Sequence, residues 1–160
     1  MAYTSSWVTI VRVVQAIFAV IVLGLTAYVI NWDDYYSWWS PSTVNFMLFN
    51  SVWTLVIALP YIVLAPVFFA GIVHPFIVVG MEAVTMIFWF AGFIALACVL
   101  PPPRACHSSL CDSLQAATVF GAFEWALFAA TTTINVMAVF TSRGNNGVKA
   151  NPNAAVHTGV

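Results

Sequence analysis

The chain has 160 residues, of which 62% are hydrophobic and only 6% are charged, and its formal net charge is -1. A soluble domain is about 25% charged, so these few charges cannot cover a solvated surface, and lipid is the expected main solvent. The near-neutral charge excludes the electrostatic footprint of a nucleic-acid-binding protein. Four Lys and Arg residues are also too few for a polybasic lipid-binding patch.

Several segments have the length of about 20 mostly apolar residues that a spanning helix needs. Their apolar runs are continuous rather than alternating, which argues against a transmembrane β-barrel. The first segment is too long for the apolar region of a signal peptide and leads into "NWDD" rather than a cleavage site, so we expect a retained signal anchor. The sequence predicts an all-α, four-helix transmembrane bundle with helices at about 8–30, 44–73, 76–100 and 114–140.

The few basic residues predict the orientation of the bundle. An even number of crossings places both termini on one side. Arg12 lies near the start of the first segment, and Arg143 and Lys149 follow the fourth, whereas Arg104 is the one basic residue on the opposite side. Since cytoplasmic loops carry the excess of Lys and Arg, both termini are expected to be cytoplasmic.

The first connection, "NWDDYYSWWSPS", is rich in aromatic residues. Trp and Tyr favour the headgroup region, where an apolar ring and a polar tip are both satisfied. We expect this loop to lie along the outer membrane surface as an anchoring belt, with a binding role as the alternative. The belt consists of Trp32, Tyr35, Tyr36, Trp38 and Trp39.

The remaining connections contain helix start signals. Between the second and third segments stands only "VHP", which predicts an antiparallel hairpin with Pro75 in the first turn of the third helix. Ser113 is the expected N-cap of the fourth helix. The tail from Ser142 is rich in Asn and Gly and is expected to be mobile. The domain is therefore assigned to residues 1–141 and a flexible cytoplasmic tail to 142–160.

The third connection, "PPPRACHSSLCDS", carries two cysteines. On the side that faces an oxidising compartment, Cys106 and Cys111 are expected to form a disulfide, with two free thiols as the alternative. Zinc binding with His107 lacks a fourth ligand, so no metal site is expected. The spacing C-x4-C rather than C-x-x-C disfavours a thiol oxidoreductase.

Polar residues inside the apolar segments recur at helical spacing. Three segments each carry one such stripe of mainly small or polar residues, and we expect these stripes to face inward. They consist of Arg12, Gln15, Ala19 and Thr26 in the first segment, Glu82, Thr85, Trp89 and Phe93 in the third, and Ala117, Gly121, Glu124, Thr131 and Asn135 in the fourth.

The depth of these residues predicts which of them meet. At a rise of 1.5 Å per residue, Arg12, Glu82 and Asn135 lie roughly 6, 10 and 8 Å from the cytoplasmic end. A charge within the membrane costs several kcal/mol unless it is paired or snorkels. We therefore expect Glu82 to pair with Arg12, directly or through water, and Asn135 or Gln15 to complete a structural network.

Glu124 lies roughly 24 Å from the same end, too far for Arg12 to reach. Its options are protonation or hydrogen bonds to hydroxyls such as that of Thr26. A lone protonatable acid could serve proton transport, but the segments offer no continuous chain of acids and histidines for a relay. A tie between helices is the favoured interpretation. Large apolar residues interrupt every stripe, which argues against a wide pore.

The second segment contains Asn50, Pro60 and Pro66 but few other polar residues, and its prolines are expected to bend it, which could shape a lipid-facing groove. The fourth segment has an alanine face opposite its polar stripe. Small residues at four-residue spacing let helix backbones approach closely, so this face predicts packing within the bundle or self-association. It consists of Ala122, Ala126 and Ala130.

Three stretches resemble fungal MARVEL-domain tetraspans, similar to the non-classical-export and eisosome-associated tetraspans. They are "RVVQAIFAVIVLGLTAYVI", "GMEAVTMIFWFAGFIALA" and "FEWALFAATT", and the resemblance covers most of residues 8–141. It implies a plasma-membrane protein that organises lipid microdomains or acts in vesicle trafficking, without catalytic residues to carry over. The residues that match are Arg12, Gln15, Gly24, Tyr28, Glu82 and Trp89.

The resulting hypothesis is a non-enzymatic membrane protein that acts through lipid contact and assembly into homo-oligomers. No cofactor is expected apart from a bound lipid or sterol, and nucleic acid is not an expected partner. The alternative is a small transporter or proton-coupled subunit that uses Glu82 and Glu124. A thiol oxidoreductase at Cys106 and Cys111 is a third interpretation.

Overall fold

The computed structural model of the chain describes residues 6–31, 41–68, 75–102 and 108–146. Everything regular within these ranges is helical. The elements in chain order are α1 (Ser6–Asn31), α2 (Pro41–Trp53), the π-helical turn η2 (Thr54–Ala58), α3 (Leu59–Phe68), α4 (Pro75–Val99) and α5 (Ser109–Asn146).

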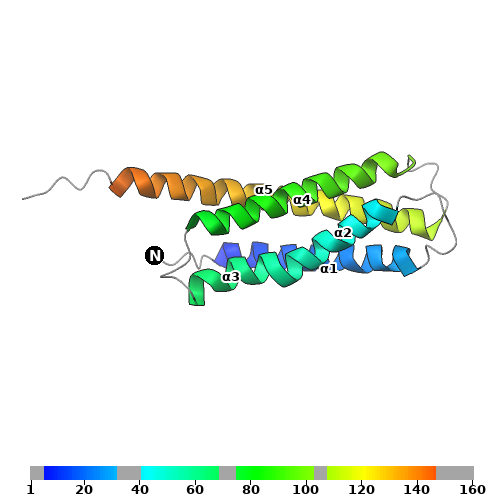
Figure 1. Cartoon of the computed structure of the whole chain (residues 1–160), viewed down its shortest axis with the longest axis horizontal. Coiled ribbons are helices and arrows are strands. Elements are labelled where there is room, and N and C mark those ends of the chain that lie inside the picture. Colours follow the sequence, from blue (N-terminus) through cyan, green and yellow to red (C-terminus); the bar gives the residue numbers. More distant parts are fainter. Residues whose placement is uncertain (1–5, 32–40, 69–74, 103–107, 147–160) are drawn as a thin grey trace, which may run out of the picture.

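The helices form a four-membered bundle in which α2, η2 and α3 together make one continuous member (Figure 1). The most extensive packing joins α5 to α4 and to α1, and α2 packs against both α1 and α4. Among the described residues α1 and α4 are not a closely packed pair, so they face each other across the interior. We refer to the end of the bundle where α1 begins and α5 ends as the Ser6 end, and to the other as the Asn31 end.

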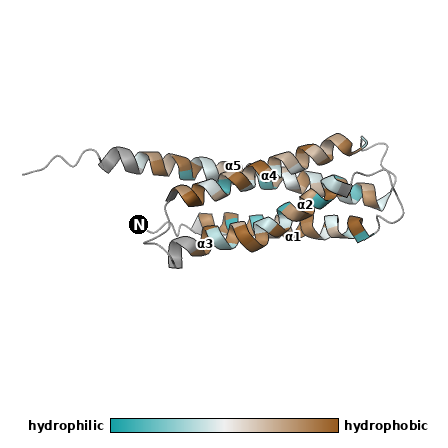
Figure 2. Ribbon diagram, in the orientation of Figure 1, coloured by the Kyte–Doolittle hydropathy of each residue, from teal (hydrophilic) through white to brown (hydrophobic). Residues whose placement is uncertain are grey.

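Four helices are long and apolar enough to cross a membrane, over Trp7–Asn31, Ser42–Leu64, Phe76–Val99 and Ser109–Thr141. The outward side chains include large apolar residues on every span, for example Ile17, Val56, Ile87 and Phe123, which are 51–67% exposed. Figure 2 shows the hydrophobic colouring along most of the bundle. The prediction of an all-α four-helix transmembrane bundle is confirmed, with helix bounds that differ at several ends.

The second span is less regular than the sequence predicts. It begins at Pro41, before the expected residue 44, and the last described residue is Phe68. The Leu59 N–H bonds to the Thr54 carbonyl five residues earlier, which makes the turn before Pro60 π-helical. Because proline has no N–H to donate to the carbonyl four residues before it, a wide turn is a common way for a helix to accommodate it. The irregularity that the prolines predict therefore lies at Pro60.

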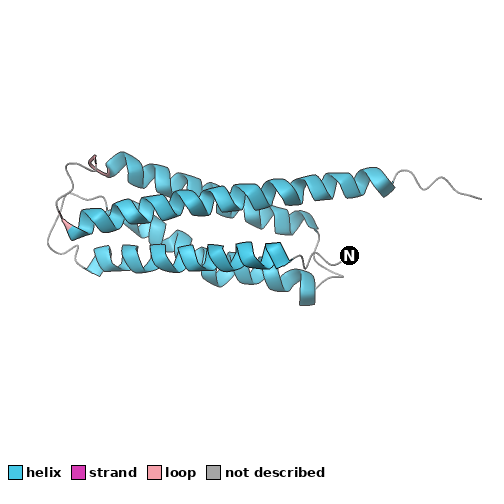
Figure 3. Cartoon of the chain, turned by 180° about the vertical axis from the view of Figure 1, so that it is seen from behind, coloured by secondary structure: helices cyan, strands magenta, loops and turns pink. Residues whose placement is uncertain are grey.

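The last helix is longer than predicted at both ends, with 38 residues from Ser109 to Asn146. Residues 142–146, assigned to the tail, continue it, and it extends beyond the other helices at the Ser6 end (Figure 3). The expected N-cap at Ser113 is wrong, because the Ser113 hydroxyl donates to the Ser109 carbonyl inside the helix. Ser108 has the capping role instead, since its Oγ accepts the Cys111 N–H at 3.3 Å.

The other helices match the sequence closely. α1 exceeds the expected 8–30 by two residues at its start and one at its end. α4 begins at Pro75, as the preference of proline for the first helical turn predicts, and ends one residue before the expected position 100.

Some predictions concern parts of the chain outside the described residues. The aromatic belt from Trp32 to Trp39 falls there entirely. So do Cys106 and His107, which leaves the predicted disulfide with Cys111 a prediction, and the tail after Asn146.

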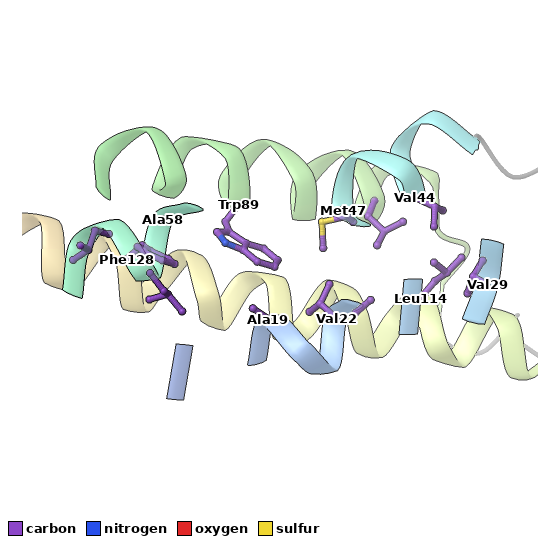
Figure 4. Close-up of a cluster of buried hydrophobic side chains, with 13 residues drawn as sticks. Ala19, Val22, Val29, Val44, Met47, Ala58, Trp89, Leu114 and Phe128 are labelled. Carbon is purple, nitrogen blue, oxygen red and sulfur yellow. The ribbon is translucent and has the colours of Figure 1, made fainter. Parts of the chain in front are cut away.

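The interior is a continuous apolar cluster to which all four members contribute. Figure 4 shows its side chains directed toward one another, with Trp89 of α4 and Met47 of α2 reaching between the helices. Both are completely buried. The backbone of two glycines admits this packing, because a Cβ on Gly92 would lie 2.7 Å from the Met47 Sδ and one on Gly121 would lie 2.9 Å from its Cε. Met47 therefore fills the space that α4 and α5 leave by having no side chain at these positions.

Candidate functional site

The charged residues of α1 and α4 meet in the interior near the Ser6 end. The Arg12 guanidinium donates through Nη2 to Glu82 Oε1, and this contact is also a salt bridge. Arg12 is 8% exposed and Glu82 is completely buried. The same guanidinium donates through Nη1 to Gln15 Oε1 at 2.9 Å. Since Gln15 follows Arg12 by three residues, both side chains lie on one face of α1.

The second oxygen of the Glu82 carboxylate is bound by α5. Asn135 donates through Nδ2 to Glu82 Oε2 at 2.6 Å. The carboxylate therefore has a partner on each oxygen, one from α1 and one from α5. The structure brings together Arg12, Gln15, Glu82 and Asn135, which we call the polar network.

The position of the network explains its physical consequence. It crosses the interior between α1 and α4, whose backbones are not closely packed, and it adds α5. Leaving one member of a buried ion pair without its partner costs about 3–5 kcal/mol. The network therefore fixes the rotation of three helices relative to one another, because turning any of them would strand a charge in lipid.

Two Trp–Thr contacts join the second span to α4. Trp89 donates through Nε1 to the Thr54 hydroxyl at 3.0 Å, and Trp53 donates through Nε1 to the Thr85 hydroxyl at 3.2 Å. Each helix thus supplies one indole and one hydroxyl. Asn50 adds a third contact, from Nδ2 to the Phe88 carbonyl at 2.8 Å.

Sequence reasoning missed these contacts, although it noted Asn50, Thr85 and Trp89 singly. The available signal was the run of polar residues in an apolar helix: Asn50 and Thr54 stand four residues apart and so share a face. Asn50, Thr54 and Thr85 are completely buried.

The expected hydrogen bond between Glu124 and Thr26 is absent from the part of the chain that the structure describes. Thr26 donates instead to the Val22 carbonyl of its own helix at 2.7 Å. Glu124 is completely buried, and neither carboxylate oxygen has a hydrogen-bond partner among the described residues. The sequence counted Glu124 among the polar network residues and favoured a tie between helices for it, but no such tie is found among the described residues.

The remaining predicted positions are distributed over the surface and one helix end. On α5, Ala122 is half-buried, whereas Ala126 and Ala130 are exposed. Cys111 is buried in the first turn of α5. Within the described ranges no three His, Cys, Asp or Glu residues lie close enough to hold a metal ion.

These features define a class. Four apolar spans surround the buried charges of α1 and α4, which neutralise each other in the interior, so this is a small polytopic membrane protein of the tetraspan type. A protein-family model described as MARVEL, the membrane-associating domain, matches residues 5–134. The chain belongs to the MARVEL family, and the resemblance found in the sequence is confirmed.

One relative has a name that bears on function. The chain is 29% identical over 152 residues to the "Non-classical export protein 2 homolog 1" of Saccharomyces cerevisiae, with 84% of this chain and 82% of the relative covered. No solved structure gives a significant match. The family description indicates membrane association and names no catalytic activity.

Proposed function

We propose that this protein organises lateral membrane domains or takes part in vesicle trafficking, through contact with lipid and self-association. The observation that carries the proposal is that the charged side chains of α1 and α4 lie in the interior of the bundle, whereas its outer surface is mainly apolar. These charges pair with each other, as Arg12 and Glu82 show, and many of the outward side chains are large and apolar. What such a surface can recognise is the bilayer or another apolar helix.

The lengths of the spans support a thick bilayer as the preferred environment. Three spans have 25, 23 and 24 residues, which corresponds to about 35–38 Å of helix. The hydrocarbon core of an average bilayer is about 30 Å thick, and that of the sterol- and sphingolipid-rich plasma membrane is about 32–33 Å. These lengths support residence in the plasma membrane. The name of the yeast relative, an export protein, supports a connection with trafficking.

Partition between coexisting lipid phases tests the proposal. The full chain, labelled at its C-terminus, is reconstituted into giant vesicles that contain a thick sterol-rich phase and a thin sterol-poor phase. We expect enrichment in the thick phase, because hydrophobic mismatch there is smaller. Vesicles of either composition alone are the control for labelling and insertion. Enrichment in the thin phase would contradict the lipid-sorting part of the proposal.

The transport alternative separates from this proposal by flux. Both oxygens of Glu82 are hydrogen-bonded, to Arg12 and to Asn135, so an ion that bound this carboxylate would have to share it with a cation already in place. We expect no proton or solute movement in liposomes that contain the protein, either for the native chain or for Glu82→Gln. A flux that the native chain supports and Glu82→Gln lacks would favour the transporter.

The proposed orientation places both termini in the cytoplasm. It is supported by the even number of spans and by the position of Arg12 near the Ser6 end. A protease applied to sealed, right-side-out vesicles should leave an epitope at either terminus intact. Cleavage of both epitopes in sealed vesicles would reverse the orientation.

A further inference from the structure

Among the described residues, Glu124 is the one buried acid that the polar network does not use. It lies near the middle of the α5 span Ser109–Thr141 and is completely buried. Glu82, the other buried acid, has a partner on each oxygen. Neither oxygen of Glu124 has a hydrogen-bond partner among the described residues. The two acids therefore differ in whether their carboxylate has hydrogen-bond donors and a cation to stabilise its negative charge.

The surroundings of Glu124 are apolar. The backbone N–H of Ala19 in α1 approaches the Glu124 carboxyl group without reaching the geometry of a hydrogen bond, and Ala19 is completely buried. One turn along α5 on either side lie Gly121 and Phe128, and the space above Gly121 is filled by Met47, Trp89 and Phe93. The environment consists of methyl groups, aromatic rings and helix backbone.

No cation among the described side chains faces this carboxyl group. On α1 the charged residue is Arg12, seven residues before Ala19, or about 10 Å along the helix axis, and its guanidinium is bound to Glu82 and Gln15. On α4 the charged residue is Glu82 itself. The other charged residues of α5 are Asp112, which is exposed near the start of the helix, and Arg143, which lies 19 residues beyond Glu124, or about 28 Å along the helix axis.

An unpaired carboxylate in such a place would lose its hydration without compensation, whereas a neutral acid would not. A neutral acid also has an acceptor for its proton, because helix carbonyl oxygens keep a second lone pair. Hydroxyl groups in this bundle donate to such second lone pairs; for example, Thr118 donates to the Leu114 carbonyl at 2.8 Å on the same helix. The geometry thus accommodates the protonated form and not the ionised one.

We propose that Glu124 is a proton-binding site in the membrane interior, that it carries its proton at neutral pH, and that it is the carboxyl group of this protein open to modification by hydrophobic carbodiimides. In that modification the acid adds across the N=C bond of the reagent. Its proton moves to a reagent nitrogen, and the O-acylisourea rearranges to an N-acylurea without a leaving group. Only the protonated acid can supply that proton, and Glu82, held by Arg12 and Asn135, cannot.

The test uses the full chain in lipid nanodiscs at neutral pH with dicyclohexylcarbodiimide. We expect a single adduct by intact-protein mass spectrometry, mapped to Glu124 and absent from Glu124→Gln. A water-soluble carbodiimide, which does not enter the bilayer, should leave Glu124 unmodified. An adduct on Glu82 with Glu124 untouched would overturn the proposal.

Infrared spectroscopy gives a readout that does not depend on access of a reagent. The native chain should show the carbonyl stretching band of a protonated carboxylic acid, and Glu124→Gln should lose it. Glu82→Gln, the matched variant, should keep that band. Loss of a carboxylate band instead of an acid band in Glu124→Gln would show that Glu124 is ionised and would refute the proposal, whatever the carbodiimide does.

Stability provides the folding control. Glutamine has the shape and neutrality of the protonated acid, so Glu124→Gln should unfold at the native denaturant midpoint. Glu82→Gln, which leaves Arg12 without its counterion, should unfold at a clearly lower one. A fall in midpoint for Glu124→Gln as large as that for Glu82→Gln would mean that Glu124 has an ionic partner, contrary to the proposal.

Discussion

At the residue scale, the side chains of Arg12 and Glu82 meet although α1 and α4 do not pack closely. Both side chains are long enough to bridge the separation of the backbones, and Gln15 and Asn135 each add one hydrogen bond to the pair. Two charges in lipid are tolerated here because each neutralises the other and both are hydrogen-bonded. A variant that removes only one of the two charges therefore loses folding stability.

We expect Arg12→Met and Glu82→Met each to destabilise the bundle by about 3–5 kcal/mol, because each leaves an uncompensated buried charge. The double variant should recover most of that loss, since apolar side chains of similar volume can replace a buried ion pair at little cost. Unfolding in mixed micelles measures the three midpoints. If the effects of the two single variants simply add in the double variant, the residues are not coupled.

At the element scale, the second span and α4 are joined by hydrogen bonds between uncharged side chains, which a search for charged residues in the sequence does not find. A π-helical turn places Thr54 opposite Trp89, and the neighbouring Trp53 reaches Thr85. The glycine at position 92 lets α4 approach this span closely. Close approach and reciprocal hydrogen bonds together fix the axial register between the second span and α4.

Gly92→Ala should destabilise the protein by about 1–3 kcal/mol, the usual range for overpacking a core. The added Cβ would lie 2.6 Å from the Asn50 Nδ2, which is bound to the Phe88 carbonyl, and 2.7 Å from the Met47 Sδ. Gly24→Ala is the matched control, because nothing lies within 4 Å of a Cβ there. Equal midpoints for the two variants would show that Asn50 and Met47 yield freely.

Thr54→Val should cost about 1–3 kcal/mol, since it leaves the Trp89 indole N–H without its acceptor in a completely buried position. Thr85→Val should cost less, because its donor Trp53 is only partly buried. Thermal unfolding in nanodiscs compares the two. A larger loss for Thr85→Val would contradict the argument that burial of the donor decides the cost.

At the scale of the whole molecule, α5 has two faces of different chemistry. Its inner face carries Asn135 to the polar network and Glu124 to the apolar centre. Its outer face exposes Ala126 and Ala130. Small side chains on a lipid-facing surface let another helix approach closely, so this alanine face is our proposed contact for self-association.

The double variant Ala126→Leu with Ala130→Leu should lower self-association at least several-fold while leaving the unfolding midpoint unchanged, because the added bulk points away from the bundle. Val20→Leu, on an α1 position that is 54% exposed, is the control for bulk on a lipid-facing surface. Energy transfer between labelled copies in vesicles measures association. Unchanged transfer in the double variant would remove the alanine face as the contact.

The sequence by itself determined the class, because apolar length needs no partner to be recognised: four runs of about 20 residues or more predict four spans. It also predicted the meeting of Arg12, Glu82 and Asn135, since helical rise fixes depth and stranded charges must find each other. Only the tertiary structure decided how α2 and α4 interlock, because the register between two apolar helices depends on the fit of side chains such as Met47 against Gly92. The same holds for Glu124, whose isolation follows from which faces of α1 and α4 turn toward it, and depth alone could not exclude the Thr26 hydroxyl.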